Sequence, residues 1–189
     1  MILQDFRLTE WAKAGGVKPF DPRCINPASI DLRLGHLWVD IERPDTVIDA
    51  LRIVLYPRSV MVDVYNKLAD LLHLPRKSTA ILATTRERIF IPYDMAGSIK
   101  LKTTPSRRGL GHPIADWIDP GFEGELTLML HAHKPIELSF EQRIVQIVIF
   151  QMSAPVSIPY GKVGHYQYQT GPTRPWTLHM KEAMHVIHK

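Results

Sequence analysis

The sequence predicts a mainly β fold, a sandwich or barrel, contained in one domain. The chain has 189 residues, of which 45% are hydrophobic and 22% charged, a balance typical of one ordinary globular core. Short segments with strand-like patterns follow one another closely, and helix-like segments are few. Proline outnumbers glycine, 15 to 11, which favours rigid turns between short elements. These observations argue against a parallel sheet with helical crossovers.

Two segments have helical character. Residues 5–14 form one candidate helix, which Gly15 and Gly16 would end, and residues 60–72 form another between two prolines. The expected strands are residues 30–39, 79–85, 88–91, 126–131 and 143–150.

Periodicity is lost from Gly161 onward, where glycine, proline, histidine and glutamine mix. We therefore predict a β domain over residues 1–160, with the helical segment at its start, and a C-terminal arm over residues 161–189. A short helix from Thr177 is an option within that arm.

Composition excludes several classes of function. A single cysteine, Cys24, excludes an internal disulfide framework and a thiolate-rich zinc site. The N-terminus lacks the apolar core of a secretory signal, and no apolar run is long enough to cross a bilayer. We expect a soluble, cytoplasmic protein with no membrane partner. The net charge of +4 is spread along the chain rather than gathered in a stripe, which suits a small polyanion and not a nucleic acid.

Familiar catalytic motifs are missing. The chain has no H-x-E with P-C-x-x-C pair, which a zinc nucleobase deaminase needs, and no P-loop, Rossmann or nucleophile-elbow motif. His131 and His133 would share one face of a strand, but two histidines without a third ligand are more often surface residues than a metal site.

Two segments carry more chemistry. Residues 102–108, KTTPSRR, place three cations and three hydroxyls in one predicted turn, the donors that phosphate oxygens require. Residues 117–124, WIDPGFEG, place Asp119 before a Pro-Gly turn that leads into an alternating strand. From chemistry alone Asp119 could equally well cap that turn.

Five segments together resemble the dCTP deaminase branch of the dUTPase superfamily. They occur in family order and extend over most of residues 25–173: INPASIDLRLG, KTTPSRRGLG, ADWIDPGFEGELTLML, QRIVQIVIF and HYQYQTGPT. The resemblance implies a distorted β-barrel or jelly-roll-like fold of the dUTPase type and a homotrimer with active sites between subunits. It also implies a C-terminal arm that closes over a pyrimidine deoxynucleoside triphosphate, with Mg²⁺ held by phosphates and water rather than by protein ligands.

The same resemblance assigns roles to individual residues. Arg107 matches an active-site arginine, and Asp119 matches the acid that holds the 3′-hydroxyl and helps to activate water. The segment Thr127, Leu128 and Met129 matches the strand that reads the base. Further substrate-binding positions are Lys102, Thr103, Thr104 and Ser106 in the phosphate loop, Ala115 near the water pocket, and Tyr160, His165, Gln169 and Arg174 near or in the arm.

One departure bears on the reaction. The deaminases of this family carry a proton-shuttling glutamate where this chain has Met129, and a thioether cannot move protons at neutral pH. We therefore expect a Mg²⁺-dependent hydrolase that cleaves dUTP or dCTP to the monophosphate and pyrophosphate, with no release of ammonia from dCTP. Asp119 and Arg107 are its expected catalytic residues. The alternatives are a dCTP deaminase and a non-catalytic nucleotide-binding regulator on the same fold.

Overall fold

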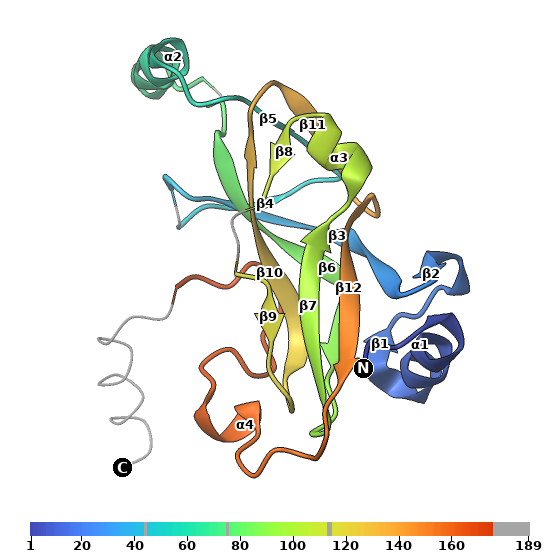
Figure 1. Ribbon diagram of the computed structural model, residues 1–189. Coiled ribbons are helices and arrows are strands. Elements are labelled where there is room, and N and C mark those ends of the chain that lie inside the picture. The colour runs from blue at the N-terminus through green and yellow to red at the C-terminus, as the bar shows by residue number, and fades with distance from the viewer. Residues whose placement is uncertain (44, 75, 113–114, 176–189) are drawn as a thin grey trace, which may run out of the picture.

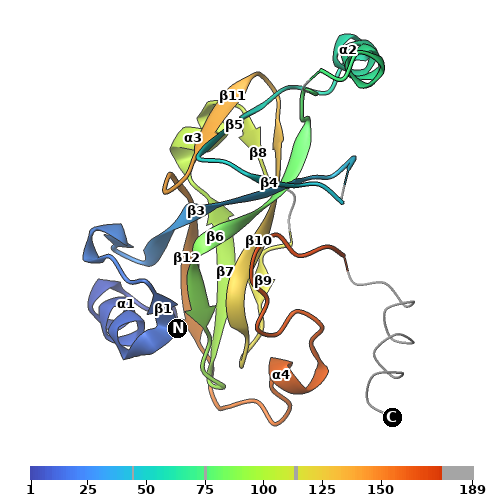
Figure 2. The ribbon, with the colours of Figure 1, turned by 180° about the vertical axis from the view of Figure 1, so that it is seen from behind.

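The computed structural model describes residues 1–43, 45–74, 76–112 and 115–175. Its main body is a strongly curled sheet that closes most of the way into a barrel, with short helices at the margins (Figures 1 and 2). The expected mainly β fold, a distorted barrel with few short helices, is confirmed. Among the described residues, no helix is both long and apolar enough to cross a membrane.

Most of the strands are short and antiparallel. They are β1 (Val17–Lys18), β2 (Ile25–Asn26), β3 (Ser29–Asp40), β4 (Val47–Asp49), β5 (Arg52–Leu55), β6 (Ala80–Phe90), β7 (Met95–Leu101), β8 (Leu110–Gly111), β9 (Trp117–Ile118), β10 (Glu123–Ala132), β11 (Ile136–Ser139) and β12 (Arg143–Gln151). The main sheet runs β8-β10-β6-β3-β12-β7-β9, with β1 against β6 and with β2 and β4 against β3, and β11 pairs with β5 in a separate ribbon.

The helical segments are short and lie outside the sheet. They are α1 (Asp5–Trp11), a π-helical turn (Ala12–Gly16), a 3₁₀ turn (Pro22–Cys24), α2 (Val60–Leu71), α3 (Thr103–Arg107) and α4 (Tyr160–Val163). Gly15 takes a φ of 102°, a left-handed value that glycine adopts without strain, and the chain leaves the first helical segment there. Ser59 caps α2 by accepting a hydrogen bond from the backbone N–H of Val62 at 3.3 Å.

Both expected helices and three of the expected strands form near their predicted bounds. Residues 79–85 and 88–91, expected as two strands, form the single strand β6. The joint is irregular: Thr85 Oγ1 donates to the carbonyl of Glu87 and accepts from the backbone N–H of Leu126 on β10. Residues 102–108, expected as a turn, contain α3. The option of a helix from Thr177 lies outside the described residues.

The core fills the inside of the curled sheet. Leu126, Leu128 and Leu130 of β10 point inward and are nearly or fully buried, while the alternate residues of the strand face outward. They meet apolar residues of β3, β6 and β12 in one continuous cluster. This core fixes β10 in register, so its outer face and free edge are held rigidly where a ligand could reach them.

Candidate active site

A cavity lies between β9, β10 and the arm. Its volume is about 640 Å³, which suits a small organic ligand. Its floor is apolar, with Ile118, Phe122 and Leu126 from the core. The polar lining residues are Asp116, Asp119, Thr127, Tyr160, Tyr166, Gln169 and Thr173. An apolar floor with a few fixed polar groups is the usual form of a binding site for a small molecule.

The arm forms one wall by adding itself to the edge of β10. The backbone N–H of Tyr168 donates to the carbonyl of Glu123 at 2.7 Å, and the N–H of Glu125 donates to the carbonyl of Gln169 at 3.0 Å. The amide of Gln169 also donates to the carbonyl of Glu125 at 2.6 Å. These bonds fix the arm against the sheet as an additional strand-like segment.

Within residues 1–43, 45–74, 76–112 and 115–175, no strand pairs with the middle of the β10 edge. β8 pairs with β10 only at His131 and Ala132, and the arm bonds to its backbone at Glu123 and Glu125. Between them lies Thr127, which lines the cavity and whose hydroxyl accepts the backbone N–H of Thr173 at 3.2 Å. The backbone around Thr127 is therefore the stretch of β10 that faces a ligand.

Two carboxylates line the cavity among the residues that the structure describes there. Asp116 accepts hydrogen bonds from the Lys100 ammonium and from Ser98 Oγ at 3.0 Å, and the Lys100 bond is the main reason that its pKa lies below the usual value of 3.8. Asp119 has a different partner: its Oδ1 accepts the indole N–H of Trp117 at 3.1 Å. Asp116 is thus a neutralised acceptor, whereas Asp119 presents its charge to the cavity.

Tyr160 joins the cavity to the arm. Its ring packs edge-on against Phe122, and its hydroxyl oxygen accepts the backbone N–H of Tyr166 at 3.2 Å. Burial raises the pKa of this phenol above its usual value of 10, so it stays neutral over the physiological range.

The phosphate-type loop lies elsewhere in the same chain. Thr103, Thr104, Ser106 and Arg107 are exposed on α3, and none of them lines the cavity. Asp119 follows Ile118, which pairs with Gly97 near the start of β7, and Lys102 follows the end of that strand. Six extended residues reach roughly 20 Å, further than the phosphates of one nucleotide extend. Figure 1 shows α3 beside β8, well apart from β9 and α4.

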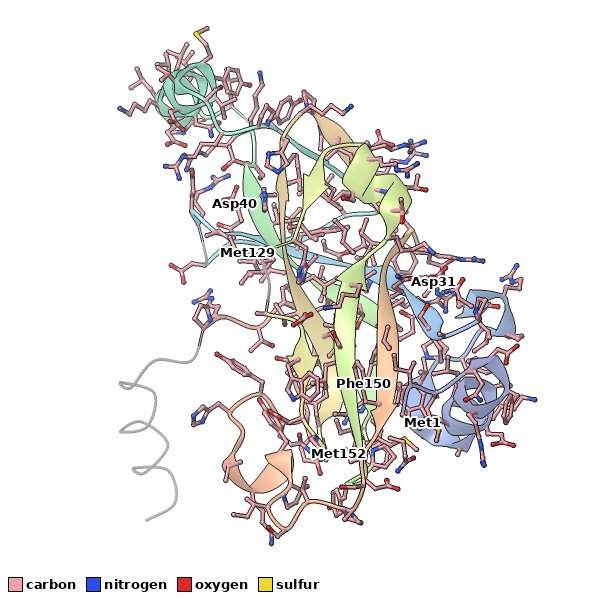
Figure 3. The ribbon with its side chains drawn as sticks, in the orientation of Figure 1. Met1, Asp31, Asp40, Met129, Phe150 and Met152 are labelled. Carbon is pink, nitrogen blue, oxygen red and sulfur yellow. The ribbon has the colours of Figure 1, made fainter. Side chains whose placement is uncertain are left out.

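Lys102 is already engaged. Its ammonium contacts Oδ1 of Asp31 at 2.6 Å, and Asp31 is almost fully buried. Asn26 Nδ2 donates to the same oxygen at 2.8 Å, and Arg143 lies 3.7 Å from the other. Asp31 lies on the β2–β3 side of the barrel, away from Met129 (Figure 3). Lys102 therefore anchors the start of α3 to the barrel.

The remaining expected site residues are divided between the cavity and the surface. Ala115 and Gln169 line the cavity, Leu128 is buried in the core and can offer only its backbone, and His165 is exposed and outside the cavity lining. Arg174 forms an ion pair of 2.8 Å with Asp45 on the loop before β4.

Sequence reasoning missed four lining residues that carry a polar group: Asp116, Trp117, Tyr166 and Thr173. A signal existed for Trp117. Around β9, Trp117 and Asp119 alternate with the apolar Ile118, and that pattern places both on one face. Nothing in the sequence pairs Asp116 with Lys100, because that pairing depends on the register between β7 and β9.

Comparisons with known proteins find matches over most of the chain. Residues 2–152 match the family model "dCTP deaminase-like". A protein of Corynebacterium glutamicum named "dCTP deaminase, dUMP-forming" is 36% identical over 182 residues, which cover 92% of this chain and 94% of that protein. A protein of Acidothermus cellulolyticus with the same name is 34% identical and covers 93% and 96%.

A solved structure agrees on the fold. The crystal structure of 2′-deoxycytidine 5′-triphosphate deaminase from Agrobacterium tumefaciens superposes with a TM-score of 0.59 at 19% identity. The match covers 78% of this chain and 47% of that longer one, so this chain spans about half of it.

The predicted hydrolase that acts without deamination is wrong. Relatives aligned over nine-tenths of both chains are named for deamination of dCTP. The prediction that dCTP releases no ammonia is therefore wrong as well. The error lies in the weight given to Met129, whose side chain is 39% exposed and does not line the cavity. The coarser prediction of an enzyme of nucleotide metabolism is confirmed. Because the family model spans most of its length, the chain belongs to the dCTP deaminase-like family.

Proposed function

We propose that this enzyme converts dCTP and two water molecules to dUMP, ammonia and pyrophosphate. Two observations support the proposal. The relatives that align over nearly the full chain are named "dCTP deaminase, dUMP-forming". The cavity beside β10 has an apolar floor for a pyrimidine and, in Asp119, a carboxylate that faces the space where the nucleoside would lie. The second observation carries the proposal, because it assigns the chemistry to this chain's own residues.

The base would lie against the middle of the β10 edge. Its ring would cover Ile118 and Phe122, and the backbone near Thr127 would read its polar edge by hydrogen bonds. Gln169 and Tyr160 would close the site from the arm side.

Deamination needs a group that takes a proton from the attacking water and returns one to the departing amine. A carboxylate can do both when it lies within hydrogen-bond reach, and such help contributes about 10²–10⁴-fold in rate. Asp119 is the better candidate of the two cavity carboxylates. Asp116 has a lowered pKa and is held by Lys100, which makes it a weaker base. Water bound beside Asp119 would add to C4 of cytosine, and ammonia would leave.

The triphosphate requires donors that the cavity itself does not supply. α3 offers Arg107 with Thr103, Thr104 and Ser106, but at roughly 20 Å along β7 from Asp119. We therefore propose that α3 of a neighbouring copy completes each site, in a homotrimer with three sites between subunits. The arm, in this arrangement, closes over the nucleotide.

Mg²⁺ is proposed to enter with the nucleotide. Across the described ranges, no three histidine, cysteine, aspartate or glutamate side chains lie close enough together to hold a metal ion. Triphosphate oxygens and water are sufficient ligands for this ion, and bound there it would neutralise part of the phosphate charge.

Product analysis tests the proposal directly. Wild-type protein with Mg²⁺ and dCTP should release ammonia and pyrophosphate in equal amounts and form dUMP. Asp119→Asn should remove both products, whereas Asp116→Asn, the matched control in the same cavity, should retain a measurable rate. Pyrophosphate without ammonia, or tight binding of dCTP without either product, would refute the proposed reaction.

A further inference from the structure

Helix α2 has an unusual distribution of side chains. Its residues that face the protein are small or polar: Val62, Asn66 and Ala69 are buried. Its large apolar side chains face solvent instead. Those of Val60, Met61 and Leu71 are about three-quarters exposed, and those of Val64, Leu68 and Leu72 are about half exposed. A surface helix of a monomer normally has the reverse arrangement, with its large apolar residues turned toward the core.

The exposed residues form one continuous stripe. At 100° per residue, positions 60, 61, 64, 68, 71 and 72 fall within an arc about 120° wide. The buried residues occupy the next arc, and Asp63, Lys67 and Asp70 occupy the third. We call the six exposed apolar residues the α2 stripe. Two separate apolar faces on one helix indicate two packing partners, of which the protein's own body is one.

The body holds α2 by polar contacts, and no contact that the described part of the chain makes with α2 covers the stripe. Asn66 Nδ2 donates to the carbonyl of Lys77 at 3.0 Å, and its Oδ1 accepts the N–H of Lys77 at 2.8 Å. Arg76 reaches Asp70 at 3.6 Å, and the Lys77 ammonium lies 4.4 Å from the ring centre of Tyr65. Figures 1 and 2 show α2 projecting from the end of the barrel, with its far side clear of every other labelled element.

The exposure of the stripe indicates an interface. Each of its six side chains is at least half exposed, the neighbouring Leu74 is 49% exposed, and contiguous exposed apolar side chains of this kind mark interaction sites. Val64 and Leu68 lie at its centre, one turn apart, the spacing at which two helices interlock.

We propose that the α2 stripe binds the α2 stripe of a second copy of this chain, as an antiparallel pair about a twofold axis. The charges on its edge are complementary in this arrangement. With the axis beside Tyr65, Lys67 of one copy meets Asp63 of the other, because the two positions lie equally far from 65. Each pair of helices therefore gains two ion pairs at its margins. The inference is independent of the proposed reaction, since none of these residues lines the cavity.

Mass measurement tests the pairing. Since the proposed trimer already joins three copies, pairing through α2 should give the wild-type protein the mass of two trimers, and Val64→Glu with Leu68→Glu should halve that mass to one trimer of the 21.6 kDa chain. Both side chains are exposed, so the variant should keep its circular dichroism spectrum. Val47→Glu is the matched control, since Val47 of β4 is 58% exposed against 55% for Val64. An equal loss in the control, or an unchanged mass in the double variant, would overturn the proposal. An unchanged mass would also mean that another protein or a lipid surface covers the stripe.

Two further variants test the geometry. Lys67→Glu should raise the dissociation constant of the pair at least tenfold, and Asp63→Lys added to it should restore the wild-type value. Val64→Cys, one residue from the axis, should form a disulfide-linked dimer on mild oxidation, whereas Asp70→Cys on the polar side should not. The native Cys24 is buried and does not interfere. Failure of the charge exchange together with equal cross-linking from both cysteines would overturn the antiparallel arrangement.

Discussion

The cavity beside β10 and the loop at α3 differ in how completely one chain builds them. The cavity is preorganised: backbone bonds tie the arm to β10, the core fixes the strand, and Trp117 orients Asp119. The α3 segment presents Arg107 and three hydroxyls to solvent, and its only cation with a buried partner is Lys102, just before the helix. In the proposed site, one chain supplies the nucleoside half, and a second copy supplies the phosphate half.

The largest expected effects come from variants that inactivate each part of the proposed site separately. Asp119→Asn and Arg107→Gln should each lower turnover by about 10³-fold, because each removes a group that acts on the reacting atoms. Mixing the two inactive variants after unfolding and refolding should restore activity to about a quarter of the wild-type value, the fraction of sites that receive both intact residues in randomly mixed rings. No recovery would show that both halves come from one chain.

Removal of the arm should affect only the cavity side. A chain that ends after Tyr160 loses the bonds from Tyr168, Gln169 and Thr173 to β10, so we expect a rise in KM and a loss of at least 100-fold in kcat/KM. The sheet should still fold, because its core lies before residue 160. Gln169→Ala should give a smaller loss of the same kind. Full activity in the truncated chain would show that the arm takes no part in the active site.

Substitutions at Lys102 and at Arg107 should have different effects, the first on stability and the second on substrate binding. Lys102→Met leaves Asp31 buried without its ammonium partner, which we expect to lower the free energy of unfolding by about 3 kcal/mol. Arg107→Gln, on the exposed helix, should leave stability unchanged and raise KM about tenfold. Urea unfolding and steady-state kinetics measure the two effects. An unchanged free energy of unfolding in Lys102→Met would indicate that this lysine binds phosphate instead of anchoring α3.

The elements that local pattern determines were predictable from the sequence. The alternation of leucines predicted the inward face of β10, and the flanking prolines predicted α2. What could not be predicted depends on register between distant strands: the union of two expected strands into β6, the Lys100–Asp116 pair and the Asp31–Lys102 pair. The motifs gave the candidate residues as one set, but only the topology shows that they fall into two groups far apart. The division at residue 160, the roles of the site residues and Mg²⁺ stay predictions.

Met129 should have the smallest effect of all, and it provides the finest test of where the chemistry occurs. Its side chain points outward from β10 and does not line the cavity, whereas Thr127, two residues earlier on the same face, does. Met129→Leu should therefore change the rate of ammonia release less than twofold, because a thioether contributes no proton transfer and leucine fills a similar volume. Thr127→Val is the control. It removes the hydroxyl that accepts the N–H of Thr173 and should lower kcat/KM about tenfold. If Met129→Glu instead raises ammonia release more than tenfold, position 129 lies at the reacting base in the assembled enzyme, and Asp119 is not the proton-transfer group.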